Sequence, residues 1–226
     1  RAFRHLNGNG FVYVWANIAF LVFSLPLFTM PAAWAGLARL SFYAIRQPHA
    51  GFEEFMDGVK EWIGRGILLA LANAAVFALN GYNLLAYRGV STLDWALRLF
   101  WIAFLVIWFS IQFYLFPLYY AMEKPRLIGA LRNAIIMVLF NPLFTLVLTL
   151  VLLIMWSIST VLFALWFLLT FSFMAVLTNV AVQDRIRRAG FDQPPAVPEV
   201  TDEVFYGENA SKTSRPVTSS GARREE

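Results

Sequence analysis

The chain has 226 residues, of which 59% are hydrophobic and only 14% are charged, with a formal net charge of +4. Soluble domains carry about a quarter charged residues, so this composition favours a chain that contacts lipid. The small positive charge fits the excess of Lys and Arg on the cytoplasmic side of membrane proteins, and it does not predict a nucleic-acid surface. The absence of Cys excludes disulfides, thiolate catalysis and Cys-ligated metals.

The strongest membrane signal is the segment 133–183, which contains no Asp, Glu, Lys or Arg. A spanning helix needs about 20 mostly apolar residues, so this segment is long enough to cross a bilayer twice. Within lipid, every backbone polar group must be hydrogen bonded, and helices satisfy this requirement internally. The sequence therefore predicts an all-α integral membrane protein, a polytopic bundle of transmembrane helices.

Six spans are expected, with five as the alternative. Pro26 and Pro31 stand at the end of the first span, where proline favours a kink or a sharp return of the chain. The second is short and carries Arg39 in its middle, so it is either a span or a helix that lies in the membrane interface. A turn near residues 157–159 separates the last two. The expected spans are residues 11–30, 32–46, 66–87, 95–122, 141–156 and 160–182.

Residues 51–65 differ from the spans because apolar and charged residues alternate at helical spacing. This pattern predicts an amphipathic helix that lies on the membrane surface and leads into the third span. The apolar face comprises Phe52, Phe55, Met56, Val59 and Ile63, and the polar face comprises Glu53, Glu54, Asp57, Lys60 and Glu61. A further, moderately apolar helix is expected over residues 127–140.

The distribution of basic residues predicts the orientation of the chain. With six crossings and a cytoplasmic N-terminus, Arg88 and Arg98 are the only basic residues of the bundle expected at the outer face, as the positive-inside rule requires. Residues 184–226 are rich in Pro, Ser, Thr, Glu and Arg, which predicts a flexible cytoplasmic tail. The tail starts with a basic cluster, expected to act as a topological stop signal or to contact anionic lipids: Arg185, Arg187 and Arg188.

One motif resembles a known family. Residues 17–32 read NIAFLVFSLPLFTMPA, and this segment resembles the opening span of the YesL-like family of bacterial membrane proteins, a domain of unknown function (DUF624). The matching positions are Asn17, Ser24, Pro26, Thr29 and Pro31. Further likenesses are Phe52 and Phe55 with residues 58–60, then residues 114–118 and 132–134, so that the resemblance covers residues 7–182.

The resemblance implies a location and an association, but no activity. It implies a multi-pass protein of the bacterial plasma (inner) membrane. Members of the family occur as companions of bacterial carbohydrate-uptake systems, and their own activity is not established. Fold likeness alone cannot define a function.

A few polar residues inside the apolar segments are candidate site residues. Arg39 is expected either to contact an anionic substrate or to extend its charge to the membrane surface. The others are expected either to line a polar pathway for a solute or to hydrogen bond neighbouring helices, which is the commoner use: Asn73, Asn80, Asn83 and Gln112. Proline-broken helices at Pro26, Pro31 and residues 141–142 are a third possibility for a substrate site.

The sequence contains no enzyme signature and implies no cofactor. The spans carry no paired carboxylates, no Ser–His pair, no phosphate-binding loop and no metal-ligand cluster. We expect a non-catalytic accessory subunit that packs against membrane lipids and other membrane-protein subunits and assists or regulates solute uptake, with carbohydrate as the solute that the resemblance implies. The alternatives are a structural subunit of a large energy-transducing complex and a small transporter acting alone or as a homodimer.

Overall fold

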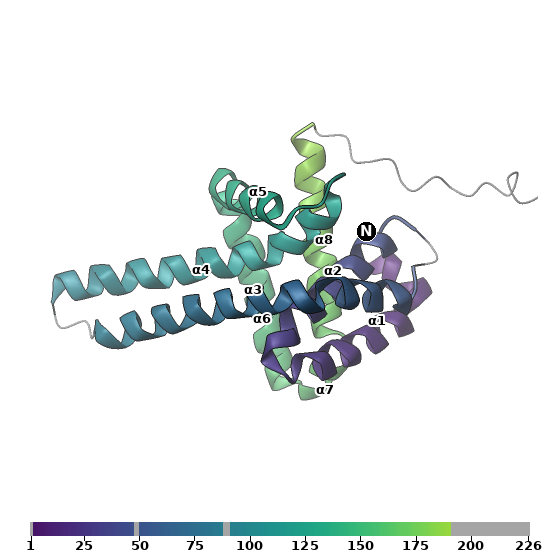
Figure 1. Cartoon of the computed structure of the whole chain (residues 1–226), viewed down its shortest axis with the longest axis horizontal. Coiled ribbons are helices and arrows are strands. Elements are labelled where there is room, and N and C mark those ends of the chain that lie inside the picture. The colour runs from purple at the N-terminus through teal and green to yellow at the C-terminus, as the bar shows by residue number, and fades with distance from the viewer. Residues whose placement is uncertain (1, 48–49, 88–90, 191–226) are drawn as a thin grey trace, which may run out of the picture. The chain divides into compact units, whose positions relative to one another are not determined.

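The computed structural model describes residues 2–47, 50–87 and 91–190, with the backbone alone for residues 2–9. The chain divides into two units, residues 1–194 and 195–226, and all the described residues belong to the first. Every regular element among them is a helix (Figure 1). The elements are α1 (Ala2–Ser24), η1 (Leu27–Thr29), α2 (Met30–Ala44), α3 (Phe52–Ala86), α4 (Thr92–Ala121), α5 (Leu127–Phe140), α6 (Pro142–Val161), α7 (Phe163–Leu168) and α8 (Thr170–Arg188).

Helix α2 lies at the centre of these helices, in contact with α1, α3, α4 and α8. Most of its buried residues are small, among them Ala32, Ala33, Ala35, Gly36 and Ala38. Small side chains allow neighbouring backbones to approach closely, and such residues are enriched where membrane helices pack together. The segment predicted as a second span is therefore a helix enclosed by protein, and it is not among the helices long and apolar enough to cross a membrane.

The closest approach is between α2 and α3, at Gly36 and Gly58. A Cβ atom on Gly58 would lie 2.8 Å from the Cα of Gly36, and one on Gly36 would lie 2.7 Å from the carbonyl oxygen of Phe55. Real Cβ atoms do not approach backbone this closely, so both positions require glycine. The two helices are in contact over their backbones rather than only through side chains.

Helix α3 is one continuous helix of 35 residues, so the segments predicted as a surface helix over residues 51–65 and a span over 66–87 join without a break. The glycines of this segment cost about 1 kcal/mol each relative to alanine, which weakens a helix without ending it. The buried face consists of Phe55, Gly58, Val59, Trp62 and Gly66. Ile63, predicted to share the apolar face, is 49% exposed.

Helices α3 and α4 form a long antiparallel hairpin (Figure 1). Beyond Gly66, Asn80 is the only buried residue of α3, and α4 has no buried residue before Ser110. The part of α3 after Gly66 is about 30 Å long at 1.5 Å per residue, which matches the thickness of a hydrocarbon core. Ser91 begins α4 with a capping box in which its side chain accepts from the amide of Asp94.

Three helices in the described part of the chain are long and apolar enough to cross a membrane: Phe52–Ala86, Thr92–Ala121 and Pro142–Val161. This part of the chain is thus all-helical with three candidate spans. The helix of the first expected span, residues 11–30, ends earlier than predicted. Helix α1 ends at Ser24 and a 3-10 turn follows, because Pro26 cannot continue the helix. The helix predicted over residues 127–140 is confirmed as α5.

The last two expected spans differ from the structure in their boundaries. Helix α6 continues through residues 157–159, so the predicted turn there is wrong, and the chain breaks instead at Leu162 and Leu169. Residues 160–182 are therefore not one continuous helix. Helix α8 also extends past residue 184, where the tail was predicted to begin, since Arg188 pairs with Asp184 at 2.8 Å one turn earlier. The remainder of the predicted tail, residues 191–226, lies outside the described residues.

Replacing Gly58 with alanine should destabilise the protein by about 1–3 kcal/mol, because the added methyl group would overpack the contact with α2. The matched control is Gly64→Ala, since a Cβ atom on Gly64 meets nothing within 4 Å. That change should be neutral or stabilising by up to about 1 kcal/mol. The measurement is the free energy of unfolding in mixed detergent micelles, and equal effects of the two substitutions would contradict the close packing.

Candidate functional site

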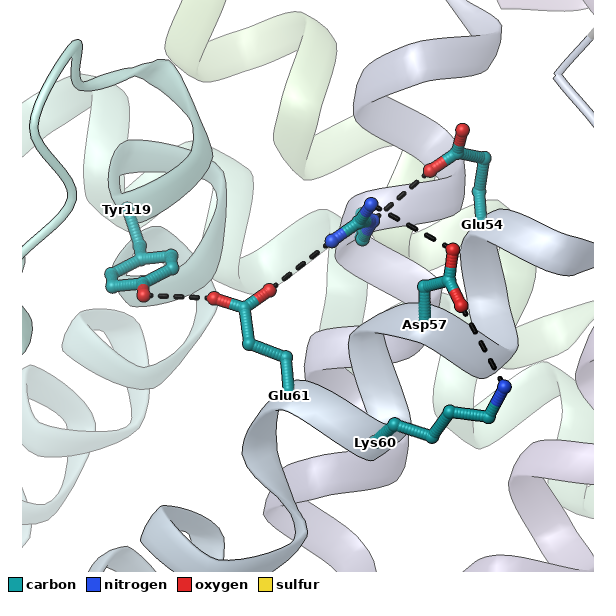
Figure 2. Close-up of polar contacts among 6 residues, drawn as sticks. Glu54, Asp57, Lys60, Glu61 and Tyr119 are labelled. Atoms are coloured by element: carbon teal, nitrogen blue, oxygen red, sulfur yellow. Dashed lines mark hydrogen bonds and ion pairs between the residues drawn. The ribbon is translucent and has the colours of Figure 1, made fainter.

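The most charged feature of the helices is a cluster around Arg39 of α2 (Figure 2). Its Nε lies 3.0 Å from Glu54, one Nη lies 3.2 Å from Glu61, and the other lies 3.9 Å from Asp57. The three acids fall at intervals of three and four residues on α3, which places them on one helix face. Lys60 lies 3.7 Å from the second oxygen of Asp57. We call these five residues the Arg39 cluster.

The cluster also reaches α4, where the hydroxyl of Tyr119 donates to Glu61 at 2.9 Å (Figure 2). Tyr119 is buried, and its ring packs edge-on against that of Trp62. The side chain of Arg39 is 24% exposed. Burial alone would lower the pKa of Arg39, but the hydrogen bond and the negative charge of Glu54 outweigh it and raise that pKa. The guanidinium is therefore charged at every physiological pH.

The Arg39 cluster holds helices together. Three carboxylates from α3 surround the guanidinium, so Arg39 is directed at protein groups and not at an external anion. The alternative prediction, a charge that extends to the membrane surface, stays a prediction; the structure adds that the cation has counter-ions within the protein. A guanidinium that bonds two carboxylates of a neighbouring helix fixes both the distance between the two helices and their relative orientation.

A second polar group lies between α3 and α4. The indole of Trp108 donates to the Oδ1 of Asn73 at 3.1 Å, and the Nδ2 of Asn73 donates to Gln112 at 3.4 Å. Asn73 and Gln112 therefore bond across helices, as predicted for polar residues that hold membrane helices together. Asn80 and Asn83 instead donate to carbonyl oxygens of their own helix.

The structure does not bring these polar residues together with Arg39 into a pathway. Two hollows lie beside the start of α6 and the end of α8, and their linings include none of Arg39, Asn73, Asn80, Asn83 or Gln112. Within the same part of the chain, no three His, Asp or Glu side chains are placed to hold a metal ion.

Asn17 of the opening motif makes the most complete hydrogen-bond set in the structure. Its Nδ2 donates to the carbonyl oxygens of Trp166 and Phe167, at 2.6 and 2.9 Å. Its Oδ1 accepts from the amides of Phe171 and Ser172, at 2.9 and 3.1 Å. These are the groups that the break between α7 and α8 leaves without helical partners. Asn17 is fully buried and completes the backbone hydrogen bonding of a helix break about 150 residues away.

The other motif residues turn α1 into α2. Pro26 precedes the 3-10 turn, and Pro31 lies in the first turn of α2, where its missing amide hydrogen costs no helical bond. The hydroxyl of Thr29 bonds to the carbonyl oxygens of Phe23 and Pro26. Ser24 is the last residue of α1, and its buried hydroxyl finds no partner. The motif thus builds a structural corner with a buried asparagine beside it.

The predicted basic cluster divides into three different environments. The guanidinium of Arg185 lies over the ring of Phe144, 3.7 Å from its centroid. Arg188 is paired with Asp184, and Arg187 is exposed. Arg185 also lines a hollow.

Sequence reasoning missed the acidic partners of Arg39 and the helix break at Leu169. The first could have been found, because an Arg inside an apolar segment needs counter-ions and acids recur three and four residues apart at 54, 57 and 61. The second carries no Pro or Gly signal, since the break depends on Asn17, which is distant in the sequence.

Comparisons with family models, curated proteins and solved structures find no match to this chain. The likeness to the YesL-like family therefore rests on the motif residues alone.

Replacing Arg39 with alanine should lower the free energy of unfolding by roughly 2 kcal/mol, because Glu54 and Glu61 would remain half-buried without their counter-ion. Arg39→Lys should recover part of this loss, since a lysine keeps the charge but not the fork. Lys60→Ala is the matched control: the side chain is 71% exposed, and we expect less than about 0.5 kcal/mol. Unfolding in mixed micelles measures all three, and an Arg39→Ala protein as stable as Lys60→Ala would refute a holding role.

Asn17→Ala should destabilise the protein by about 3 kcal/mol, since two carbonyl and two amide groups at the α7–α8 break would lose their partner. Asn83→Ala removes a bond that is made only within its own helix and should cost less than about 1 kcal/mol. Amide hydrogen exchange of Phe171 and Ser172 provides a local readout. Unchanged protection of these amides in Asn17→Ala would contradict the bridging role.

Proposed function

We propose that this protein is a non-catalytic accessory subunit of a bacterial membrane transport system, and that the α3–α4 hairpin is the element that binds its partner. The observation that carries the proposal is that very few residues of the hairpin are buried by the rest of the described structure. Between Gly66 and Ser110, which are both buried, Asn80 is the only buried residue among those that the structure describes. Two long apolar helices thus extend into lipid with their outer faces available to another membrane protein.

Internal bonds favour a hairpin that is held as one piece. Asn73, Trp108 and Gln112 link its two helices near mid-length, and the Arg39 cluster links its base to α2. An element ordered before it meets a partner loses less conformational entropy on binding.

Carbohydrate uptake is the process that we propose for the partner system, and the support is the family resemblance at Asn17, Ser24, Pro26, Thr29 and Pro31. A structural subunit of an energy-transducing complex would use the same hairpin and differ only in its partner. Transport by this chain alone receives less support, because Arg39 is occupied by carboxylates and Asn80 by its own helix.

The test is extraction of the tagged full-length chain from native membranes with a mild detergent, followed by identification of proteins that co-purify in fixed stoichiometry. We expect a membrane component of a solute-uptake system. Respiratory or photosynthetic subunits would favour the energy-transducing alternative, and a clean monomer or homodimer would remove both subunit roles. A gene deletion that leaves sugar uptake unchanged would remove the carbohydrate assignment.

Tryptophan substitutions on the hairpin locate the contact. Leu68, Leu71, Leu79 and Leu99 are 69%, 63%, 52% and 67% exposed, so a larger apolar side chain there can be accommodated by lipid but not by a closely packed partner. At least one of these substitutions should reduce the co-purifying partner by about tenfold or more, as a clash of about 1–3 kcal/mol predicts. Leu150→Trp on α6, at 53% exposure, is the control outside the hairpin. Equal partner yield in all five variants would exclude the hairpin as the binding element.

A further inference from the structure

The end of α8 and the start of α6 together enclose an unassigned hollow of about 320 Å³. Its lining is Phe140, Asn141, Pro142, Leu143, Phe144 and Arg185. Arg185 is the one charged residue of this lining. In the described part of the chain, no carboxylate pairs with it. Its Nε is buried and has no hydrogen-bond partner. Because a buried donor without a partner is costly, the hollow is suited to a ligand that accepts a hydrogen bond and carries negative charge.

The position of the guanidinium is restricted by the Phe144 ring, which lies 3.7 Å from it. A cation held on an aromatic face loses little freedom when it binds a ligand. The hollow also includes the first turn of α6, where no side chain caps the helix, so the partial positive charge of the helix start adds to that of Arg185. Both features favour an anion.

A second hollow of about 300 Å³ adjoins the first, and Phe144 lines both. It is an apolar groove between α6 and α8, lined by Phe144, Val147, Leu148, Val151, Leu177, Val180 and Ala181, with Asp184 as its one charged residue. Asp184 is paired with Arg188, which offsets its repulsion of an anion. From the Arg185 end, the lining follows α6 forward and α8 backward for two turns. A free phosphate would gain no apolar contact from this groove, whereas an acyl chain would bury its apolar surface there.

We propose that these two hollows form one binding site for an anionic phospholipid. The headgroup phosphate accepts from Arg185 and faces the start of α6, and one acyl chain lies in the groove between α6 and α8. Helix α6 is a candidate span that starts at Pro142, so its first turn lies at the depth of lipid headgroups. This site is separate from the α3–α4 hairpin and does not depend on the role proposed for the hairpin.

The site can be tested by native mass spectrometry of the delipidated full-length protein, titrated with dioleoyl phosphatidylglycerol. Arg185→Gln should weaken the tightest binding event by about tenfold, since a hydrogen bond to a charged group is lost. Arg187→Gln makes the same change of net charge at an exposed position and should alter binding less than about twofold. Equal losses in the two variants would mean that only general surface charge attracts the lipid, and would overturn the proposal.

The groove has its own controls. Val180→Trp fills it and should reduce phosphatidylglycerol binding, whereas Leu146→Trp lies on α6 outside the lining and should not. Glycerophosphoglycerol, which is the headgroup without chains, should compete poorly. Competition by this headgroup or by inorganic phosphate at equal concentration would show a free-anion site and overturn the lipid assignment. If Arg185→Gln does not fold, Arg185→Lys and Val180→Trp still decide between these outcomes.

Discussion

The contact of α2 with α3 at Gly36 and Gly58 is the constraint on which the other described contacts depend. It brings two backbones close enough that the guanidinium of Arg39, one turn after Gly36, reaches acids on two successive turns of α3. A Cβ atom on Gly58 would itself lie 3.2 Å from the Cβ of Arg39, so close packing and ion pairing occur at the same place. Since Glu61 also accepts from Tyr119 near the end of α4, the same contact positions the base of the α3–α4 hairpin.

Composition and hydropathy were enough to predict an all-helical membrane protein, because lipid exposure and helix length are properties of local sequence. They do not settle the number of spans, since a buried helix such as α2 is about as apolar as α3 and hydropathy does not distinguish protein from lipid. The three described helices that are both long and apolar enough to span each overlap a predicted span. The surface helix was predicted separately because its charges suggested water, whereas much of that charge faces Arg39.

The candidate site was only partly predictable for a similar reason. Arg39 stands out in the sequence because charge in an apolar segment is rare, but its partners are recognisable only once α3 is placed beside α2. Asn73 and Gln112 lie on different helices, and their pairing depends on the register of the hairpin. The hollow at Arg185 is formed by residues about 40 positions apart in the sequence. The basic cluster alone therefore could not reveal that one of its arginines differs from the others.

Asn17 has a consequence for the order in which the chain assembles as it leaves the ribosome. Its amide lies in the first helix, and the four backbone groups that it bonds lie at the junction of the last two. During synthesis α1 exists long before residues 166–172 do, so the asparagine must be accommodated by water, lipid headgroups or the insertion machinery until those residues have been made. The junction between α7 and α8, for its part, acquires its full set of bonds only when it meets α1. The contact of α1 with the α7–α8 junction therefore forms only after the intervening helices have been made.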